Sequence, residues 1–88
     1  MKNLVKSIKA LNVNEKINFE YNLKTYVIRC FYISRKGFKD YSVYKNNSIV
    51  FDGMNVEKIT KKYITLYSYD MMNNKTIYKM NIDKITTI

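Results

Sequence analysis

The sequence predicts a mainly β (α+β) protein, in which an N-terminal amphipathic helix precedes a small, strongly curled antiparallel sheet of about five to seven short strands. Helical spacing of apolar residues occurs near the N-terminus, and a period of two begins near residue 16. Turn-forming residues then separate short β-branched or aromatic runs. The 88 residues include no proline and only two glycines. We therefore expect a single domain over residues 1–88, with the helix at residues 2–12 and the sheet at 16–88.

The expected helix has one narrow apolar side. Its apolar residues are Leu4, Val5, Ile8 and Leu11, and lysines occupy the opposite side. Asn12 and Asn14 are suitable places for the helix to end, because asparagine tolerates the left-handed backbone conformation. A basic amphipathic helix can lie on a membrane or a partner, but four apolar residues favour a role in covering one open end of the sheet.

Two strands are expected next. Ile17, Phe19 and Tyr21 alternate with polar residues, and Asn22 marks the end of this first strand. Residues 25–34 are β-branched or aromatic at most positions, which favours a central strand. Simple alternation places Val27, Phe31 and Ile33 on one face, and Tyr26, Ile28, Cys30 and Tyr32 on the other.

The middle of the chain is rich in turn signals. Residues 35–40 form an expected loop around Gly37, and residues 41–45 return as a strand. A turn at Asn46 and Asn47, a short strand at 48–51 and an Asp52-Gly53 turn follow. Residues 54–62 fit either one or two helical turns or an irregular strand. We favour the strand, which leads through Lys61 and Lys62 into a strand at 63–69.

The last hairpin has two alternatives, which differ in the number of residues in the turn around Asn73 and Asn74. An even number pairs Tyr69 with Tyr78 and places the tyrosines in the core. An odd number brings Ile64 and Leu66 to the core side, opposite Tyr78, Met80 and Ile82. The tyrosines at 63, 67 and 69 then share the outer face with Ile77, Lys79 and Asn81. We favour the odd turn because it separates aliphatic from amphipathic residues more cleanly.

The spacing of Val56, Ile59, Ile64 and Leu66 resembles the middle of SH3-like and Sm-like small barrels. A helix followed by short strands is also similar to that group of folds. The resemblance implies a small barrel and carries no functional residues.

The composition favours a binding protein over an enzyme. Histidine is absent and there is one cysteine, which excludes Ser-His-Asp triads, Cys-His nucleophilic sites and the usual zinc ligand sets. We therefore expect no catalytic residues, metal or cofactor. The net charge of +9 favours polyanionic partners, with nucleic acid first. Abundant Lys, Ile, Asn and Tyr are also typical of an AT-rich genome, which offers a second explanation for the basicity.

The leading functional prediction is nucleic-acid binding, to RNA or DNA, because bases stack on aromatic side chains while lysines follow the phosphates. The expected contact residues are Arg35, Lys36, Lys39, Lys61, Lys62, Tyr63, Tyr67, Tyr69 and Lys79. The alternative is a protein-interaction module, such as a phage or mobile-element inhibitor or regulator that acts on an acidic surface of a larger host enzyme.

The remaining expectations concern location and assembly. One cysteine cannot form an internal disulfide, which favours the cytoplasm. No apolar run is long enough for a signal-peptide core or a membrane span, so no membrane insertion is expected. Exposed edge strands allow a homo-oligomer through sheet pairing.

Overall fold

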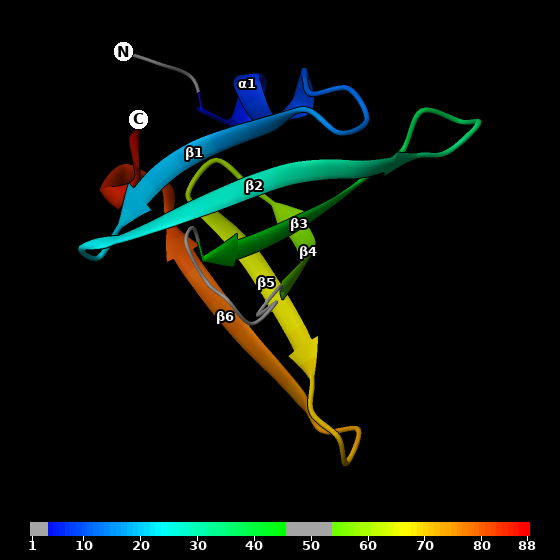
Figure 1. The fold of residues 1–88 in the computed structure, drawn as a ribbon, viewed down its shortest axis with the longest axis vertical. Helices are drawn as coiled ribbons and strands as arrows, with labels where there is room; N and C mark the ends of the chain where they lie inside the picture. The colour runs from blue at the N-terminus through cyan, green and yellow to red at the C-terminus, as the bar shows by residue number, and fades with distance from the viewer. Residues whose placement is uncertain (1–3, 46–53) are drawn as a thin grey trace.

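The computed structural model describes residues 4–45 and 54–88, and it contains one curled sheet with a short helix packed on it (Figure 1). The elements are α1 (Leu4–Lys9), β1 (Lys16–Tyr21), β2 (Lys24–Ile33), β3 (Lys39–Lys45), β4 (Met54–Ile59), β5 (Tyr63–Tyr69), β6 (Lys75–Asn81), the 3₁₀ helix η1 (Ile82–Lys84) and β7 (Thr86–Thr87). The expected turns at Asn46-Asn47 and Asp52-Gly53, the strand between them, and the expected helix start all lie outside the described residues.

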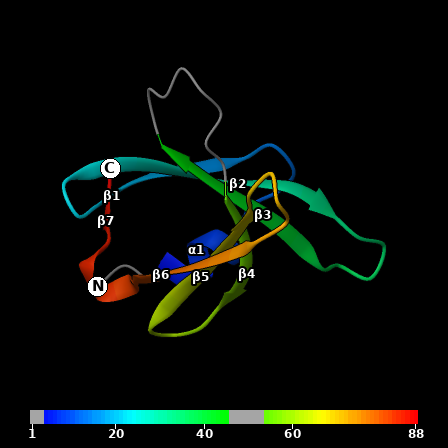
Figure 2. The ribbon, with the colours of Figure 1, turned by 90° about the horizontal axis from the view of Figure 1, so that it is seen from below.

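The sheet is antiparallel throughout, with the strand order β6-β5-β4-β3-β2-β1-β7. η1 carries the chain from β6 to β7, which pairs with β1 at the other end of the order. The sheet therefore curls until its two ends approach each other (Figure 2). The backbone N–H of Asn81 in β6 donates to Tyr21 Oη of β1 at 3.4 Å, which links β6 to the strand beside β7. The predicted class, mainly β with a strongly curled antiparallel sheet, is confirmed.

The core fills the inside of the curl, and helix α1 covers one end of it. Leu4 and Ile8 of α1, with Leu11 beyond it, belong to the buried cluster, as the apolar stripe predicted. The sheet contributes Phe19, Ile28, Cys30, Tyr41, Val43, Ile64, Leu66 and Met80. Burial of these side chains is the main favourable term for a domain of this size.

Helix α1 is shorter than the predicted 2–12, since it ends at Lys9. The ammonium group of Lys39 explains this end. Lys39 Nζ donates to the carbonyl oxygens of Lys9 at 2.6 Å and Leu11 at 2.7 Å. The last carbonyls of a helix have no intrahelical donor. A lysine from β3 supplies that donor here, so the helix need not continue to residue 12.

The β1–β2 hairpin matches the prediction, whereas the predicted faces of β2 need a correction. Asn22 and Leu23 both have positive φ, 55° and 65°, as the two central residues of a tight type I′ turn require. In β2 the register shifts between Cys30 and Tyr32, so Phe31 is an extra residue in the strand. The bulge moves Ile33 to the core side, away from the face it was predicted to share with Val27.

The next two strands lie close to their predicted positions, and the strand favoured for the segment from residue 54 is confirmed. β3 begins at Lys39 rather than at residue 41, because the connecting turn is compact: Gly37 N–H donates to Ser34 C=O at 2.9 Å, with Gly37 at φ 89°. Residues 54–59 form a strand, so the helical alternative for this segment is excluded. In β4 the register shifts between Val56 and Lys58, which makes Glu57 a second bulge residue.

Candidate nucleic-acid interface

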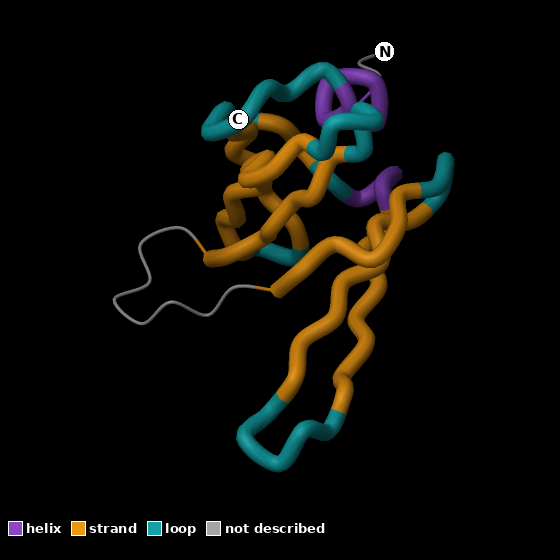
Figure 3. Tube along the Cα trace, turned by 90° about the vertical axis from the view of Figure 1, so that its right-hand side faces the viewer, coloured by secondary structure: helices purple, strands orange, loops and turns teal. Residues whose placement is uncertain are grey.

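The turn that decides the last hairpin contains five residues, 70–74, between the paired Tyr69 and Lys75. Asp70 organises it: its Oδ1 accepts the backbone N–H groups of Met72 at 2.9 Å and Asn74 at 2.8 Å. Asn73 supplies the left-handed residue, with φ 67°. The odd-numbered alternative is therefore the observed one. Figure 3 shows the β5–β6 hairpin extending away from the end of the molecule that carries α1.

The register of this hairpin separates a buried face from an outer face. Ile64 pairs with Met80 and Leu66 with Tyr78, and both β5 residues are fully buried in the core. The intervening residues of β5 must therefore point outward. Their pairs are Tyr63 with Asn81, Thr65 with Lys79, Tyr67 with Ile77 and Tyr69 with Lys75.

We call this outer surface the tyrosine face. It consists of Tyr63, Tyr67 and Tyr69 on β5, Lys58 on β4, and Lys75, Ile77, Lys79 and Asn81 on β6. Thr65 points to the same side but is buried. Seven strand residues at about 3.3 Å each give it a length of roughly 20 Å. An aromatic row flanked by ammonium groups on both neighbouring strands is suited to flat, negatively charged ligands.

The three tyrosines are not equally available. Lys79 Nζ lies 5.6 Å from the centroid of the Tyr63 ring, and Lys75 Nζ lies 4.9 Å from that of Tyr67. Tyr67 also meets Tyr69 edge to face, with their centroids 5.9 Å apart. Tyr69 is 56% exposed, whereas Tyr67 is half-buried. Tyr69 therefore offers the most accessible ring of the row.

The carboxylate of Glu57 is paired with a lysine of the tyrosine face. Glu57 Oε1 lies 2.7 Å from Lys75 Nζ. The hydrogen bond from Lys75 lowers the pKa of Glu57, and the same bond raises the pKa of Lys75. Both groups are therefore charged at neutral pH. Because Glu57 neutralises Lys75, the unpaired positive charge near the tyrosines comes mainly from Lys58 and Lys79.

A basic turn adjoins one end of the face. Thr60 Oγ1 accepts the backbone N–H groups of Lys62 at 3.3 Å and Tyr63 at 3.0 Å, which closes the connection between β4 and β5. Lys62 C=O accepts the N–H of Ile82 at 2.8 Å, so the turn is held against the end of β6. Lys61 and Lys62 are thereby exposed next to Tyr63, as the sequence predicted.

The other predicted contact residues lie elsewhere. Arg35 and Lys36 are exposed in the β2–β3 connection, which projects on the opposite side of the molecule from the β4–β5 turn (Figures 1 and 2). Lys39 is half-buried and its ammonium group is bonded to the end of α1. The structure therefore brings together Lys61, Lys62, Tyr63, Tyr67, Tyr69 and Lys79, and separates the remaining three from them.

Sequence reasoning missed Lys58 and Lys75. Lys75 and Lys79 are four residues apart on β6, so they lie on the same face of the strand. The odd turn that places Lys79 on the outer face therefore also predicts that position for Lys75. Lys58 had no such signal, because alternation from Met54 and Val56 would direct it inward. The bulge at Glu57 turns Lys58 outward and leaves Ile59 packed against the core.

Comparisons with protein-family models, curated proteins and solved structures find no match to this chain. Across residues 4–45 and 54–88, no helix is both long and apolar enough to cross a membrane. The same residues hold no cluster of three or more Asp, Glu, His or Cys side chains suited to a metal ion.

Proposed function

We propose that this chain is a small, non-enzymatic nucleic-acid-binding protein that holds single strands on the tyrosine face. Bases would stack first on Tyr69. They would stack on Tyr63 and Tyr67 after Lys79 and Lys75, respectively, move away from those rings. Lys58, Lys61, Lys62 and Lys79 would contact phosphates. We also propose that the curled sheet is a small barrel of the SH3-like or Sm-like kind, because β7 returns to pair with β1.

The observation that carries this proposal is the register of β5 and β6, which turns three tyrosines outward among lysines from both flanking strands. An even-numbered turn would have directed the same tyrosines into the core. Stacking on an aromatic side chain contributes about 1 to 3 kcal/mol per base and tolerates any sequence. Single strands are favoured over duplexes, because bases in a duplex already stack on each other.

Binding of a fluorescent single-stranded oligonucleotide of roughly 12 nucleotides, followed by anisotropy at increasing salt, tests the proposal. Three or four phosphate contacts should give a log-log salt slope of about −2 to −3, at about −0.7 for each contact. A duplex of the same length should bind more weakly at high salt, where stacking carries more of the affinity. Absence of binding to both RNA and DNA at low salt would overturn the proposal.

A second candidate function, a protein-interaction module, is favoured by the far end of the β2–β3 hairpin. Phe31, Tyr32 and Phe38 are 40%, 53% and 72% exposed there, and Arg35 and Lys36 lie in the same hairpin. Aromatic and arginine side chains are the commonest anchors of protein interfaces. Cross-linking in a host-cell extract treated with nuclease would test it, since a nucleic-acid-mediated partner is lost under that treatment.

A further inference from the structure

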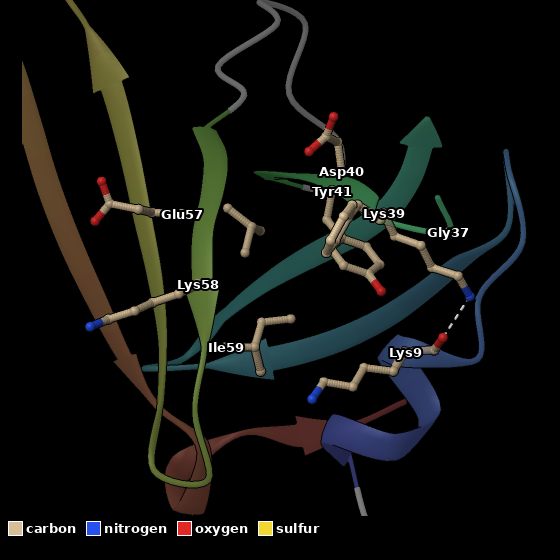
Figure 4. Close-up of a pocket in the computed structure, with 10 residues that line it drawn as sticks. Lys9, Gly37, Lys39, Asp40, Tyr41, Glu57, Lys58 and Ile59 are labelled. Carbon is tan, nitrogen blue, oxygen red and sulfur yellow. Dashed lines mark hydrogen bonds between the residues drawn. The ribbon is translucent and has the colours of Figure 1, made fainter. Parts of the chain in front are cut away.

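A cleft opens where β3 and β4 separate. In the described residues their ladder contains two pairs, Ser42 with Asn55 and Val43 with Met54. Beyond these pairs, residues 39–41 and 56–59 line the two walls of a cleft of about 380 Å³ (Figure 4). This volume lies within the range of about 300 to 1,000 Å³ that is typical of ligand pockets.

Both walls of the cleft present strand backbone. Residues 39–41 pair with β2 along one edge, and residues 56–59 belong to the β4 segment that pairs with β5. No described strand pairs with either segment on the cleft side. Because alternate residues of an antiparallel strand direct their N–H and C=O groups to opposite edges, about half of these groups face the cleft. Such an edge is a template for one more strand.

The bulge at Glu57 determines what the β4 wall contributes. Figure 4 shows the side chains of Glu57 and Lys58 pointing away from the cleft, whereas Ile59 points into it. Glu57 and Lys58 therefore line the cleft with their backbone. Tyr41, which is buried, and the half-buried Val56 and Ile59 provide apolar surface beneath. Exposed backbone above an apolar floor is suited to an extended peptide rather than to a compact ligand.

The charges around the cleft indicate the character of that peptide. Lys9 lies at the foot of the cleft, at the end of α1 (Figure 4). Lys39 is bonded to the helix end and Glu57 to Lys75, so neither charge is available to a ligand. Asp40 also lines the cleft and is exposed, but it lies at the end away from Lys9 (Figure 4), so an acidic group is repelled there and attracted only at the Lys9 end. A carboxylate near Lys9 would be attracted. A second copy of this chain carries the same net charge of +9 and would be repelled.

We propose that this cleft binds an extended peptide segment of an acidic partner protein, which adds as a strand to the unpaired edge of β4 and places a carboxylate near Lys9. Main-chain hydrogen bonds would supply affinity. Tyr41 and Ile59 would select apolar residues at alternate peptide positions. This cleft is distinct from the proposed nucleic-acid site, because the two share only Lys58, whose side chain points away from the cleft. An acidic protein is also the partner class of the second candidate function.

The test uses a synthetic peptide with blocked ends, in which valine and threonine alternate before two terminal glutamates. Amide hydrogen exchange followed by NMR should show protection of cleft-facing amides in residues 39–41 and 56–59 on peptide addition. Amides that pair β5 with β6 should keep their rates. A peptide methylated at alternate backbone nitrogens should bind at least about tenfold more weakly, since it loses two or more hydrogen bonds. Equal binding of the methylated peptide would overturn strand addition.

Charge variants test the assigned orientation. Lys9→Glu should weaken peptide binding by about three- to tenfold, because attraction becomes repulsion. Lys24→Glu makes the same change in net charge at an exposed site outside the cleft and should alter binding less than about twofold. Lys9→Gln guards against a loss of helix stability in the first variant. Equal effects of Lys9→Glu and Lys24→Glu would overturn the site. Tyr69→Ala should leave peptide binding unchanged, so the two proposals can fail separately.

Discussion

The ammonium group of Lys79 lies over the ring of Tyr63, 5.6 Å from its centroid, across the pairing of β6 with β5. A base that stacks on this ring must compete with that cation or displace it toward a phosphate. In the proposed complex Lys79 would serve as a phosphate contact, whereas in the structure it lies over the ring.

Replacement of Lys79 should change the salt dependence more than the affinity at high salt. Lys79→Gln removes one phosphate contact, so the log-log slope for single-stranded oligonucleotide should fall by about 0.7. It also uncovers the Tyr63 ring, which partly offsets the loss. Anisotropy titrations at several salt concentrations measure both effects. Lys24→Gln, which is an exposed lysine outside the tyrosine face, is the control and should change the slope less.

Tyr69 should be the most sensitive position for stacking. Tyr69→Ala should weaken single-strand binding by about 5- to 150-fold, which corresponds to about 1 to 3 kcal/mol for one stacked base. Tyr32 is a matched control, because it is 53% exposed against 56% for Tyr69 and lies on another hairpin. A similar loss of affinity in Tyr32→Ala would count against the tyrosine face.

Lys39 should matter for stability rather than for binding. Lys39→Met removes the donor to the Lys9 and Leu11 carbonyls, at 2.6 and 2.7 Å, while keeping most of the aliphatic stem. Hydrogen bonds from charged donors justify an expected loss of about 1 to 3 kcal/mol in the free energy of unfolding. Urea denaturation gives the value. Lys36→Met, on the exposed connection, should leave the urea midpoint almost unchanged.

The β5–β6 turn should respond to acid through Asp70. Backbone hydrogen bonds from Asn74, and then Met72, lower the pKa of Asp70. A carboxyl group with a lowered folded-state pKa stabilises the fold above its unfolded-state pKa of about 3.9, and loses that contribution as pH falls through the folded-state pKa. Protection of the turn amides in hydrogen exchange should therefore fall below about pH 4. Asp70→Asn should abolish this part of the pH dependence, and an unchanged profile would contradict the assignment.

The hydroxyl group of Thr65 does not stabilise the fold through a hydrogen bond. Thr65 is 2% exposed, and its Oγ1 has no hydrogen-bond partner among the described residues. Thr65→Val keeps the shape of the side chain and removes a buried polar atom, so the free energy of unfolding should stay level or rise by about 1 kcal/mol. Thermal unfolding measures this. A clear loss of stability would show that the hydroxyl group is bonded in solution.

The curled sheet could be predicted from the sequence, because the alternation of apolar and polar residues and the turn-forming residues are local signals. Asn22 ended β1 where predicted, and the odd turn at 70–74 followed from the separation of Ile64 and Leu66 from the tyrosines. The two bulges were not predictable, because one extra residue in a strand leaves no compositional mark. They reversed the faces of Ile33 and Lys58. The role of Lys39 also depends on a contact with residues about 30 positions away.

Strand β6 ends the sheet order, and it carries Lys75 and Lys79 on its outer face. If two molecules met along this strand, ammonium groups from both would converge, and charged residues of this kind protect sheet edges from growing into fibrils. A bound polyanion would cancel that protection. Lys79, which is proposed to contact a phosphate, would then also help to decide whether neighbouring molecules along one nucleic-acid strand stay separate or join edge to edge.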